Sequence, residues 1–414
     1  MTITLLLDMD GTLLDNSVRT FVPAYMEAVA RHLAARVGLE QLNEALLTST
    51  RQMILNQNPD CTLLDVFECN FYPRVGIPRD ELAPLLVEFF ANVYPDLKHL
   101  TERRPEAIEF VQQALKREYR VAVATNPLFP LTAIEQRLEW AGLSPREYPF
   151  AVVPGAENVH FAKPNPAFLA ELLAVMGWPE GPAIMVGDDL ENDILCAQAL
   201  GLATYAVDTH NHDHDSDHDG NAHPYKTPQG SGILGDLLGW IDSIPTDELK
   251  ADMSSSSALL AVLRSTPAAL NTLCKQIVPG TWNQRSRPDE WSPAEIFCHL
   301  RDVEQEVNLP RLNKVLGEPN PFIPGQDTDA WAQQRSYLDQ NGELALNSFV
   351  SSRIQLIKMI SQMDGSDWQR PARHAIFGPT ILQELIRIIT GHDRLHIRQL
   401  YSIIHPPAAD SPAG

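Results

Sequence analysis

Short apolar runs alternate with amphipathic segments over the first half of the chain. The runs have the length of buried parallel strands. They predict strands at 2–7, 119–124, 149–153, 183–187 and 202–207. Apolar residues spaced three and four apart predict intervening helices at 106–117, 130–141, 166–176 and 190–200, and a later helix at 231–243. Strands that alternate with helices are typical of an α/β fold with a parallel sheet.

The first two predicted strands are separated by about a hundred residues, far more than a crossover connection needs. This region has no good strand pattern, and helical periodicity is found near 20–37, 40–56 and 80–94. We therefore expect a helical subdomain, residues 15–94, inserted into a core formed by residues 1–14 and 95–243.

The pattern changes after this core. Residues 244–256 are polar, contain Pro245 and include four consecutive serines from Ser254, which predicts a linker. Beyond it only helical patterns are found, near 257–277, 293–308, 343–363 and 381–403. These patterns predict an all-α four-helix bundle over residues 257–404.

Composition narrows the possible partners. The formal net charge is −21, which disfavours nucleic acid and anionic membranes, since both require a basic surface. No apolar run reaches the length of a membrane span of about 18 residues, and the first apolar run lacks the basic flank of a signal peptide. The five cysteines are scattered, which suits a reducing cytoplasm. The sequence does not determine the oligomeric state.

The first predicted strand ends in two carboxylates, Asp8 and Asp10, followed by Gly11 and Thr12. Open α/β sheets bind their ligands at the carboxyl ends of the strands. Two carboxylates at such an end attract a hard cation such as Mg²⁺. An acidic turn without a metal is the alternative interpretation.

Later segments fit these carboxylates. The second predicted strand ends in Thr125 and Asn126, whose polar groups can hold phosphate oxygens. Lys163 precedes a predicted helix and can neutralise a phosphate. Each of these residues alone is weak evidence, because Thr125 can cap a turn and a lysine is often a solvated charge.

The fourth predicted strand ends in an acidic cluster that contains Asp188, Asp189 and Asp193. Asp188 and Asp193 are five residues apart across a strand-to-helix turn, so both can face one cation. Asp189 can alternatively stabilise the helix N-terminus. Four such segments, each at a strand end and in this order, together indicate phosphoryl transfer.

With these motifs, residues 1–243 resemble the haloacid dehalogenase superfamily of phosphohydrolases. The resemblance implies a Rossmann-like parallel sheet with the first-motif strand in the centre and a C1-type helical cap over residues 15–94. It implies that Asp8 is the nucleophile and that Asp10 is the general acid and base. Thr125 and Lys163 would stabilise the transferring group, and Asn126 would help to bind substrate. The Mg²⁺ ligands would be Asp8, the Asp10 carbonyl and Asp188, with Asp189 or Asp193 in support.

The implied activity is hydrolysis of a small phosphorylated metabolite through an aspartyl-phosphate. A phosphomutase with the same nucleophile and a non-catalytic sensor are alternatives. The cap contains arginines that are candidates for a second anionic group of the substrate, although exposed helix charges are the simpler interpretation: Arg19, Arg31, Arg51 and Arg74. The His/Asp-rich run at 208–223 is interpreted as a solvated insertion, with loose metal binding as the alternative.

Three histidines in the second half lie on apolar helix stripes. His299 follows a capping box, Ser292-Pro293-Ala294-Glu295, and lies on the same stripe as Ile296 and Val303. His392 and His396 are four residues apart, so their rings can converge on one ion. A lone core histidine is the usual interpretation, but this trio favours a metal site, with Glu295, Asp302 and Asp393 as candidates for orienting the rings.

Residues 254–404 also resemble the DinB-like (YfiT-type) four-helix family. The resemblance is carried by Trp291-Ser292, Glu295 and His299-Leu300, and by the segment from His392 to Leu400. It implies a Zn²⁺ or Ni²⁺ site at His299, His392 and His396. The chemistry of this half is not specified by the sequence.

Overall fold

The computed structural model describes residues 2–208 and 227–406. Apart from Asp208, the His/Asp-rich run at 208–223 lies outside the described residues. The chain forms two compact units, the first built mainly from residues up to Met253 and the second mainly from Ser254 onward. None of the described helices combines the length and the apolar character that a membrane span requires.

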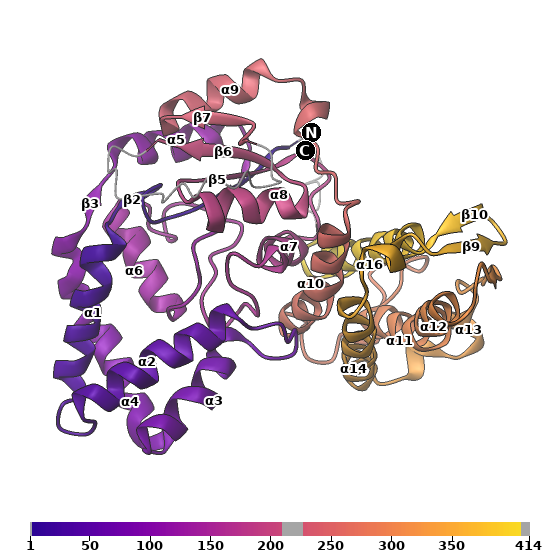
Figure 1. The fold of residues 1–414 in the computed structure, drawn as a ribbon, viewed down its shortest axis with the longest axis horizontal. Helices are drawn as coiled ribbons and strands as arrows, with labels where there is room; N and C mark the ends of the chain where they lie inside the picture. Colours follow the sequence, from indigo (N-terminus) through magenta and orange to yellow (C-terminus); the bar gives the residue numbers. More distant parts are fainter. Residues whose placement is uncertain (1, 209–226, 407–414) are drawn as a thin grey trace, which may run out of the picture. The chain divides into compact units, whose positions relative to one another are not determined.

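The first unit is built on a five-stranded sheet in the order β4-β1-β5-β6-β7, in which every neighbouring pair is parallel. Its strands β5, β6 and β7 are labelled in Figure 1. The strands are β1 (Thr4–Leu7), β4 (Arg120–Val123), β5 (Ala183–Gly187), β6 (Ala203–Val207) and β7 (Gly230–Gly232). The helices that follow or connect them are α5 (Pro105–Lys116), α6 (Leu131–Ala141), α7 (Pro166–Val175), α8 (Cys196–Leu200) and α9 (Leu237–Ser243). All residues of β1 and β5 are buried, as expected for central parallel strands.

Four of the five predicted strands are confirmed, and the strand predicted at 149–153 is wrong. That segment lies beside β4 through two backbone hydrogen bonds, Ala151 N to Val121 O (2.7 Å) and Val123 N to Val152 O (3.0 Å), but it is not a strand. Pro149 begins the segment and Pro154 follows it, and both lack the N–H donors needed to extend the pairing. The sequence also missed β7, because its residues Gly-Ser-Gly have no apolar side chain.

The insert contains four helices, α1 (Val18–Leu33), α2 (Leu39–Ile54), α3 (Leu63–Val75) and α4 (Arg79–Asn92). They group together in Figure 1, where they are indigo to purple. The insert begins and ends at an antiparallel pair of short strands, β2 (Leu14–Asp15) and β3 (Glu102–Arg103). The sequence predicted α1, α2 and α4. It missed α3, whose apolar residues are spread around the helix and which begins at a capping box of Thr62 and Asp65.

The second unit contains the predicted four-helix bundle, formed by α10 (Ser256–Cys274), α11 (Pro293–Val303), α14 (Gly342–Ser361) and α16 (Leu382–Ile404). Both α10 and α11 pack against α14 and α16. A π-helical segment, η5 (Glu304–Asn308), continues α11 into α12 (Leu309–Gly317).

The expectation that this half contains only helices is wrong. Three short strands, β8 (Phe322–Ile323), β9 (Pro371–His374) and β10 (Gly378–Ile381), form a second sheet in the order β10-β9-β8. The strands have only two to four residues, so an alternating pattern cannot be distinguished from a loop in the sequence.

Candidate active site and metal centre

The carboxylates predicted from separate strand ends meet at one edge of the main sheet. Asp8 follows β1, while Asp188 and Asp193 follow the neighbouring parallel strand β5. Lys163, from the loop before α7, donates hydrogen bonds to Asp8 Oδ1 (2.7 Å) and to Asp193 Oδ1 (2.6 Å). These three side chains are at most 8% exposed, so the interactions are shielded from water.

Negative charge exceeds positive charge in this cluster. One oxygen from each of Asp8, Asp188 and Asp193 lies within 4.8 Å of the others, and Lys163 is the cation between them. Burial, followed by the charge of Asp8, raises the pKa of Asp188 to about 7. Three clustered carboxylate ligands, two of them buried and one half-buried, with excess negative charge match the preferences of a hard divalent cation such as Mg²⁺.

Gly11 permits the close approach of Asp188 to the first motif. Its φ is +74°, and a Cβ at this position would overlap the Asp188 carboxylate. A residue with a side chain would therefore be strained there and would displace one of the three clustered carboxylates.

A cavity of about 690 Å³ opens at this edge and is bounded by residues of both the core and the insert. The predicted site residues that line it are Asp8, Asp10, Thr125, Asn126, Lys163, Asp188, Asp189 and Asp193. Thr125 is buried, and Asn126 Nδ2 lies 3.4 Å from the Lys163 carbonyl oxygen. Asp189 accepts a hydrogen bond from Asn192 N (2.7 Å), so its carboxylate caps the following helical turn, as the alternative interpretation expected.

The Asp10 side chain has partners that the sequence analysis did not identify. Its carboxylate pairs with the guanidinium of Arg137 on α6 and accepts a hydrogen bond from Asn16 Nδ2 (2.9 Å). Arg137 is buried and stacks over Phe21, and burial lowers its pKa to about 10. One signal was present in the sequence, because Arg137 interrupts the apolar stripe of Ile134, Leu138 and Ala141 on its helix.

Of the four cap arginines, only Arg19 lines the described cavity. Arg31 lies on an exposed stretch of α1 near Glu27 (3.5 Å), and Arg74 donates to the Asn70 carbonyl of its own helix (2.8 Å). Arg51 is exposed.

In the second unit, the three predicted histidines converge. His392 Nε2 lies 3.0 Å from His299 Nε2 and 3.1 Å from His396 Nε2. Tetrahedral zinc with Zn–N bonds of about 2.0–2.1 Å has N···N edges of about 3.3 Å. The arrangement therefore fits a transition metal bound by three imidazole nitrogens.

The surroundings keep these rings neutral, which is the form that binds metal. Burial, followed by the charges of the neighbouring histidines, lowers the pKa of His299 to about 2 and that of His392 to about 3. Trp291 stacks parallel to His396 with a centroid separation of 5.6 Å. His396 Nδ1 lies 2.8 Å from Gln399 Oε1, a contact that fixes the ring orientation.

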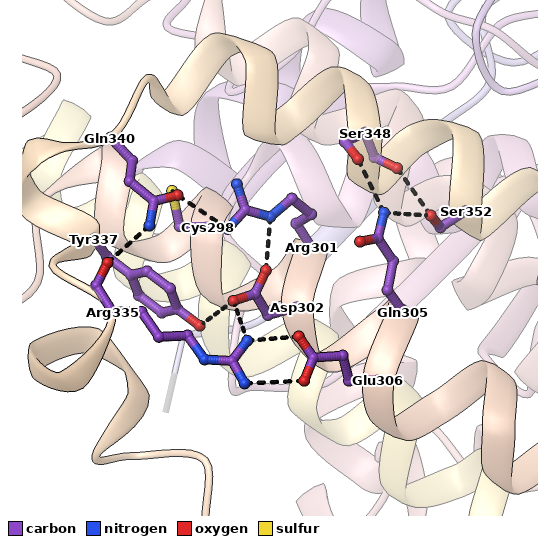
Figure 2. Close-up of polar contacts among 10 residues, drawn as sticks. All are labelled: Cys298, Arg301, Asp302, Gln305, Glu306, Arg335, Tyr337, Gln340, Ser348 and Ser352. Atoms are coloured by element: carbon purple, nitrogen blue, oxygen red, sulfur yellow. Dashed lines mark hydrogen bonds and ion pairs between the residues drawn. The ribbon is translucent and has the colours of Figure 1, made fainter.

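The carboxylates expected to orient the rings have other partners. Glu295 pairs with Arg285 and caps α11 through Ser292. Asp302 binds Arg301, Arg335 and Tyr337, as Figure 2 shows. Asp393 pairs with the buried Arg353. Among the described contacts, none of these three carboxylates accepts a hydrogen bond from a histidine of the trio, so the expectation that they orient the rings is wrong. Charged arginine donors form stronger hydrogen bonds with a carboxylate than a neutral imidazole does.

Two family models match separate parts of the chain, one in each unit. Residues 4–201 match the model for haloacid dehalogenase-like hydrolase, and residues 263–400 match the DinB superfamily. The phosphoglycolate phosphatase of Mesorhizobium japonicum is 28% identical over 207 residues, covering 49% of this chain and 80% of the relative. The phosphoglycolate phosphatase of Caulobacter vibrioides is 32% identical over 136 residues, covering 32% of this chain and 54% of the relative.

A solved structure is similar as well. YfiT from Bacillus subtilis, which has an unusual four-helix bundle topology, aligns with 39% of this chain and 90% of its own chain, at 16% identity and a TM-score of 0.33. From the two family models, residues 4–201 of the chain belong to the haloacid dehalogenase-like hydrolases and residues 263–400 to the DinB superfamily.

Proposed function

We propose that the first unit hydrolyses small phosphate monoesters with Mg²⁺ and a covalent aspartyl-phosphate. The observation that carries this proposal is the contact of Lys163 with both Asp8 and Asp193 beside Asp188. An anionic nucleophile attacks a phosphate dianion only where positive charge offsets the repulsion. A Mg²⁺ held by Asp8, Asp188 and Asp193, with the Asp10 carbonyl as a further ligand, would supply the remaining positive charge.

In the first step an Asp8 oxygen bonds to phosphorus as the ester P–O bond breaks, and protonated Asp10 gives its proton to the leaving alkoxide. In the second step Asp10 takes a proton from water, whose oxygen attacks phosphorus and releases Asp8 and phosphate. Arg137 and Asn16 hold the Asp10 carboxylate in place for both transfers. Thr125 and Lys163 would stabilise the transferring phosphoryl group.

The substrate is expected to be a small phosphorylated metabolite. The cavity of about 690 Å³ accommodates such a molecule, and two of the relatives are named phosphoglycolate phosphatases. A phosphomutase would use the same nucleophile but return the phosphoryl group to the product. Product analysis separates the two reactions, because only hydrolysis releases inorganic phosphate in proportion to substrate consumed.

The test is release of phosphate from p-nitrophenyl phosphate by the full chain with and without Mg²⁺. Asp8→Asn should abolish the activity, while Asp80→Asn, a change of the same type at an exposed position of α4, should leave it unchanged. Activity that survives in Asp8→Asn would refute the nucleophile assignment.

For the second unit, the convergence of His299, His392 and His396 supports a bound Zn²⁺ or Ni²⁺ ion. Metal analysis of the purified full chain should find one such ion, and the triple change of these histidines to alanine should remove it. Exposed His99→Ala is the matched control and should retain the metal. A stoichiometric ion that persists in the triple variant would contradict the site.

A further inference from the structure

A small cavity in the second unit extends from His392 along the bundle. Its volume is about 170 Å³, close to the cavity of about 150 Å³ that holds benzene in an engineered protein. Most of its wall is aliphatic, formed by Val303, Val307, Leu312, Ile360, Leu382, Leu385, Ile386, Ile388 and Ile389. The polar residues on the wall are Asn308, Arg311, Gln326, Thr328 and His392. The lining therefore suits an apolar body of about six carbon atoms.

Arg311 is the charged residue of this lining, and its charge is not balanced by a carboxylate. Among the described residues its hydrogen bond goes to the Pro324 carbonyl oxygen (3.2 Å), and no ion pair is formed. The side chain is partly buried, and burial lowers the pKa of Arg311. Elsewhere in the bundle, arginines such as Arg301 and Arg353 pair with carboxylates. An unpaired guanidinium in an apolar cavity of a chain with net charge −21 favours an anionic ligand.

Of the three histidines, His392 lines the cavity, and it lies at the opposite end of the lining from Arg311. Residues 303, 307 and 311 follow His299 at intervals of four along α11, η5 and α12. Residues 389, 385 and 382 precede His392 along one face of α16. His299 lies against His392, and both helical segments line the same cavity. The chain therefore runs away from the histidines along the first segment and toward them along α16.

We propose that this cavity binds an elongated monocarboxylate, with its carboxylate on Arg311 and a metal-ligating group at the three histidines. A single guanidinium matches a carboxylate in charge and in bidentate geometry, whereas a phosphate dianion would require a second cation. The aliphatic wall holds the chain between the two ends. The metal end of this proposal rests on the three-histidine metal centre proposed above, and the carboxylate end does not.

The carboxylate end is tested with metal-free full-length protein by calorimetric titration of heptanoate and heptan-1-ol, which share chain length and differ in charge. Arg311→Gln should weaken heptanoate binding by about tenfold or more, the worth of a charged hydrogen bond, and leave heptan-1-ol unchanged. Arg311→Lys keeps the charge and should restore part of the affinity. Arg287→Gln, at an exposed position of the same unit, is the control. Equal heptanoate affinity in wild type and Arg311→Gln, or no heptanoate binding to wild type, would overturn the proposal.

The metal end is tested with zinc-loaded protein and 7-mercaptoheptanoate, whose thiolate can bind zinc. It should bind about tenfold tighter than heptanoate, and His396→Ala should remove the gain without changing heptanoate affinity. A zinc-loaded protein that shows no gain overturns this end. If the three-histidine metal centre does not exist, the wild type will retain no zinc, and this outcome is distinct from a missing gain in affinity. The effect of Arg311 on heptanoate binding is measured in metal-free protein and does not depend on that outcome.

Discussion

The Lys163 ammonium lies 2.7 Å from the Asp8 carboxylate although the two residues are 155 positions apart in the sequence. Burial disfavours the ammonium, but Asp193 and Asp8 outweigh it and raise the pKa of Lys163. The lysine is therefore held in its charged form and pairs with two buried carboxylates.

We predict that Lys163→Met abolishes phosphate release and lowers the free energy of unfolding by about 3–5 kcal/mol, because buried carboxylates lose their partner. The measurements are p-nitrophenyl phosphate turnover and urea unfolding of the full chain. Lys116→Met removes an exposed charge from α5 and should change neither quantity appreciably. Full activity in Lys163→Met would remove the lysine from the proposed mechanism.

Gly11→Ala should raise the Mg²⁺ concentration needed for half-maximal activity by about tenfold, since its Cβ would displace the Asp188 carboxylate. The positive φ adds a backbone cost of about 1–2 kcal/mol. Gly76→Ala is a matched control, because Gly76 has a similar φ of +68° and nothing within 4 Å of its added Cβ. It should lose comparable stability and keep the wild-type Mg²⁺ dependence. Identical Mg²⁺ dependence in all three proteins would contradict the role of Gly11.

The convergence of Asp8, Asp188 and Asp193 was predictable because it follows from backbone geometry. Neighbouring parallel strands end at the same edge of a sheet, so a polar residue just after each strand has a known location. The pairing of His392 with His396 follows in the same way from helical periodicity. Both inferences need only local structure and one rule of strand or helix arrangement.

Contacts made through long side chains were not predictable. Arg137 reaches Asp10 from α6, and Gln399 contacts His396 within α16. Many other partners were compatible with each of these sequence positions. Asp302 and Asp393 lie near the histidines in sequence, yet Arg335, in a turn distant in sequence, binds Asp302, and Arg353 on α14 binds Asp393. Short strands such as β7 were missed because pairing with β6, not their own composition, makes them strands.

Arg353 connects three segments of the bundle and is fully buried. It donates to Glu304 on η5 (2.6 Å) and pairs with Asp393 on α16, which also accepts from Thr266 Oγ1 on α10 (3.0 Å). We predict that Arg353→Met destabilises the second unit by about 3–5 kcal/mol, because two buried carboxylates are left unpaired. Urea unfolding followed by circular dichroism measures the effect.

The combined variant Arg353→Met, Glu304→Gln, Asp393→Asn should be less destabilised than Arg353→Met alone, because no charge is left without a partner. Arg287→Met removes an exposed arginine 3.6 Å from Glu290 and should cost less than about 1 kcal/mol. If the combined variant is the least stable of the three, packing and not charge is what the network contributes.

Acid should weaken the second unit through Asp302. Burial opposes the charged form of this carboxylate, but donors on Arg301 (2.7 Å), Tyr337 (2.7 Å) and Arg335 (2.6 Å) outweigh it and lower the pKa of Asp302 from 3.8 (Figure 2). Glu306 shares Arg335 and is the other acidic group in this contact. A lowered folded-state pKa contributes stability that is present above pH 3.8 and is lost as the pH falls through the folded value.

Asp302→Asn should therefore lower the free energy of unfolding at neutral pH by about 1.5–3 kcal/mol, the worth of hydrogen bonds to a charged group. The difference from wild type should narrow as the pH falls below 3.8, because the wild-type carboxyl then becomes neutral as well. Tyr337→Phe removes one of the donors and should shift this narrowing to higher pH. The measurement is urea unfolding of the three proteins across this range. A difference that stays constant with pH would mean that Asp302 stabilises the bundle through its shape and not its charge.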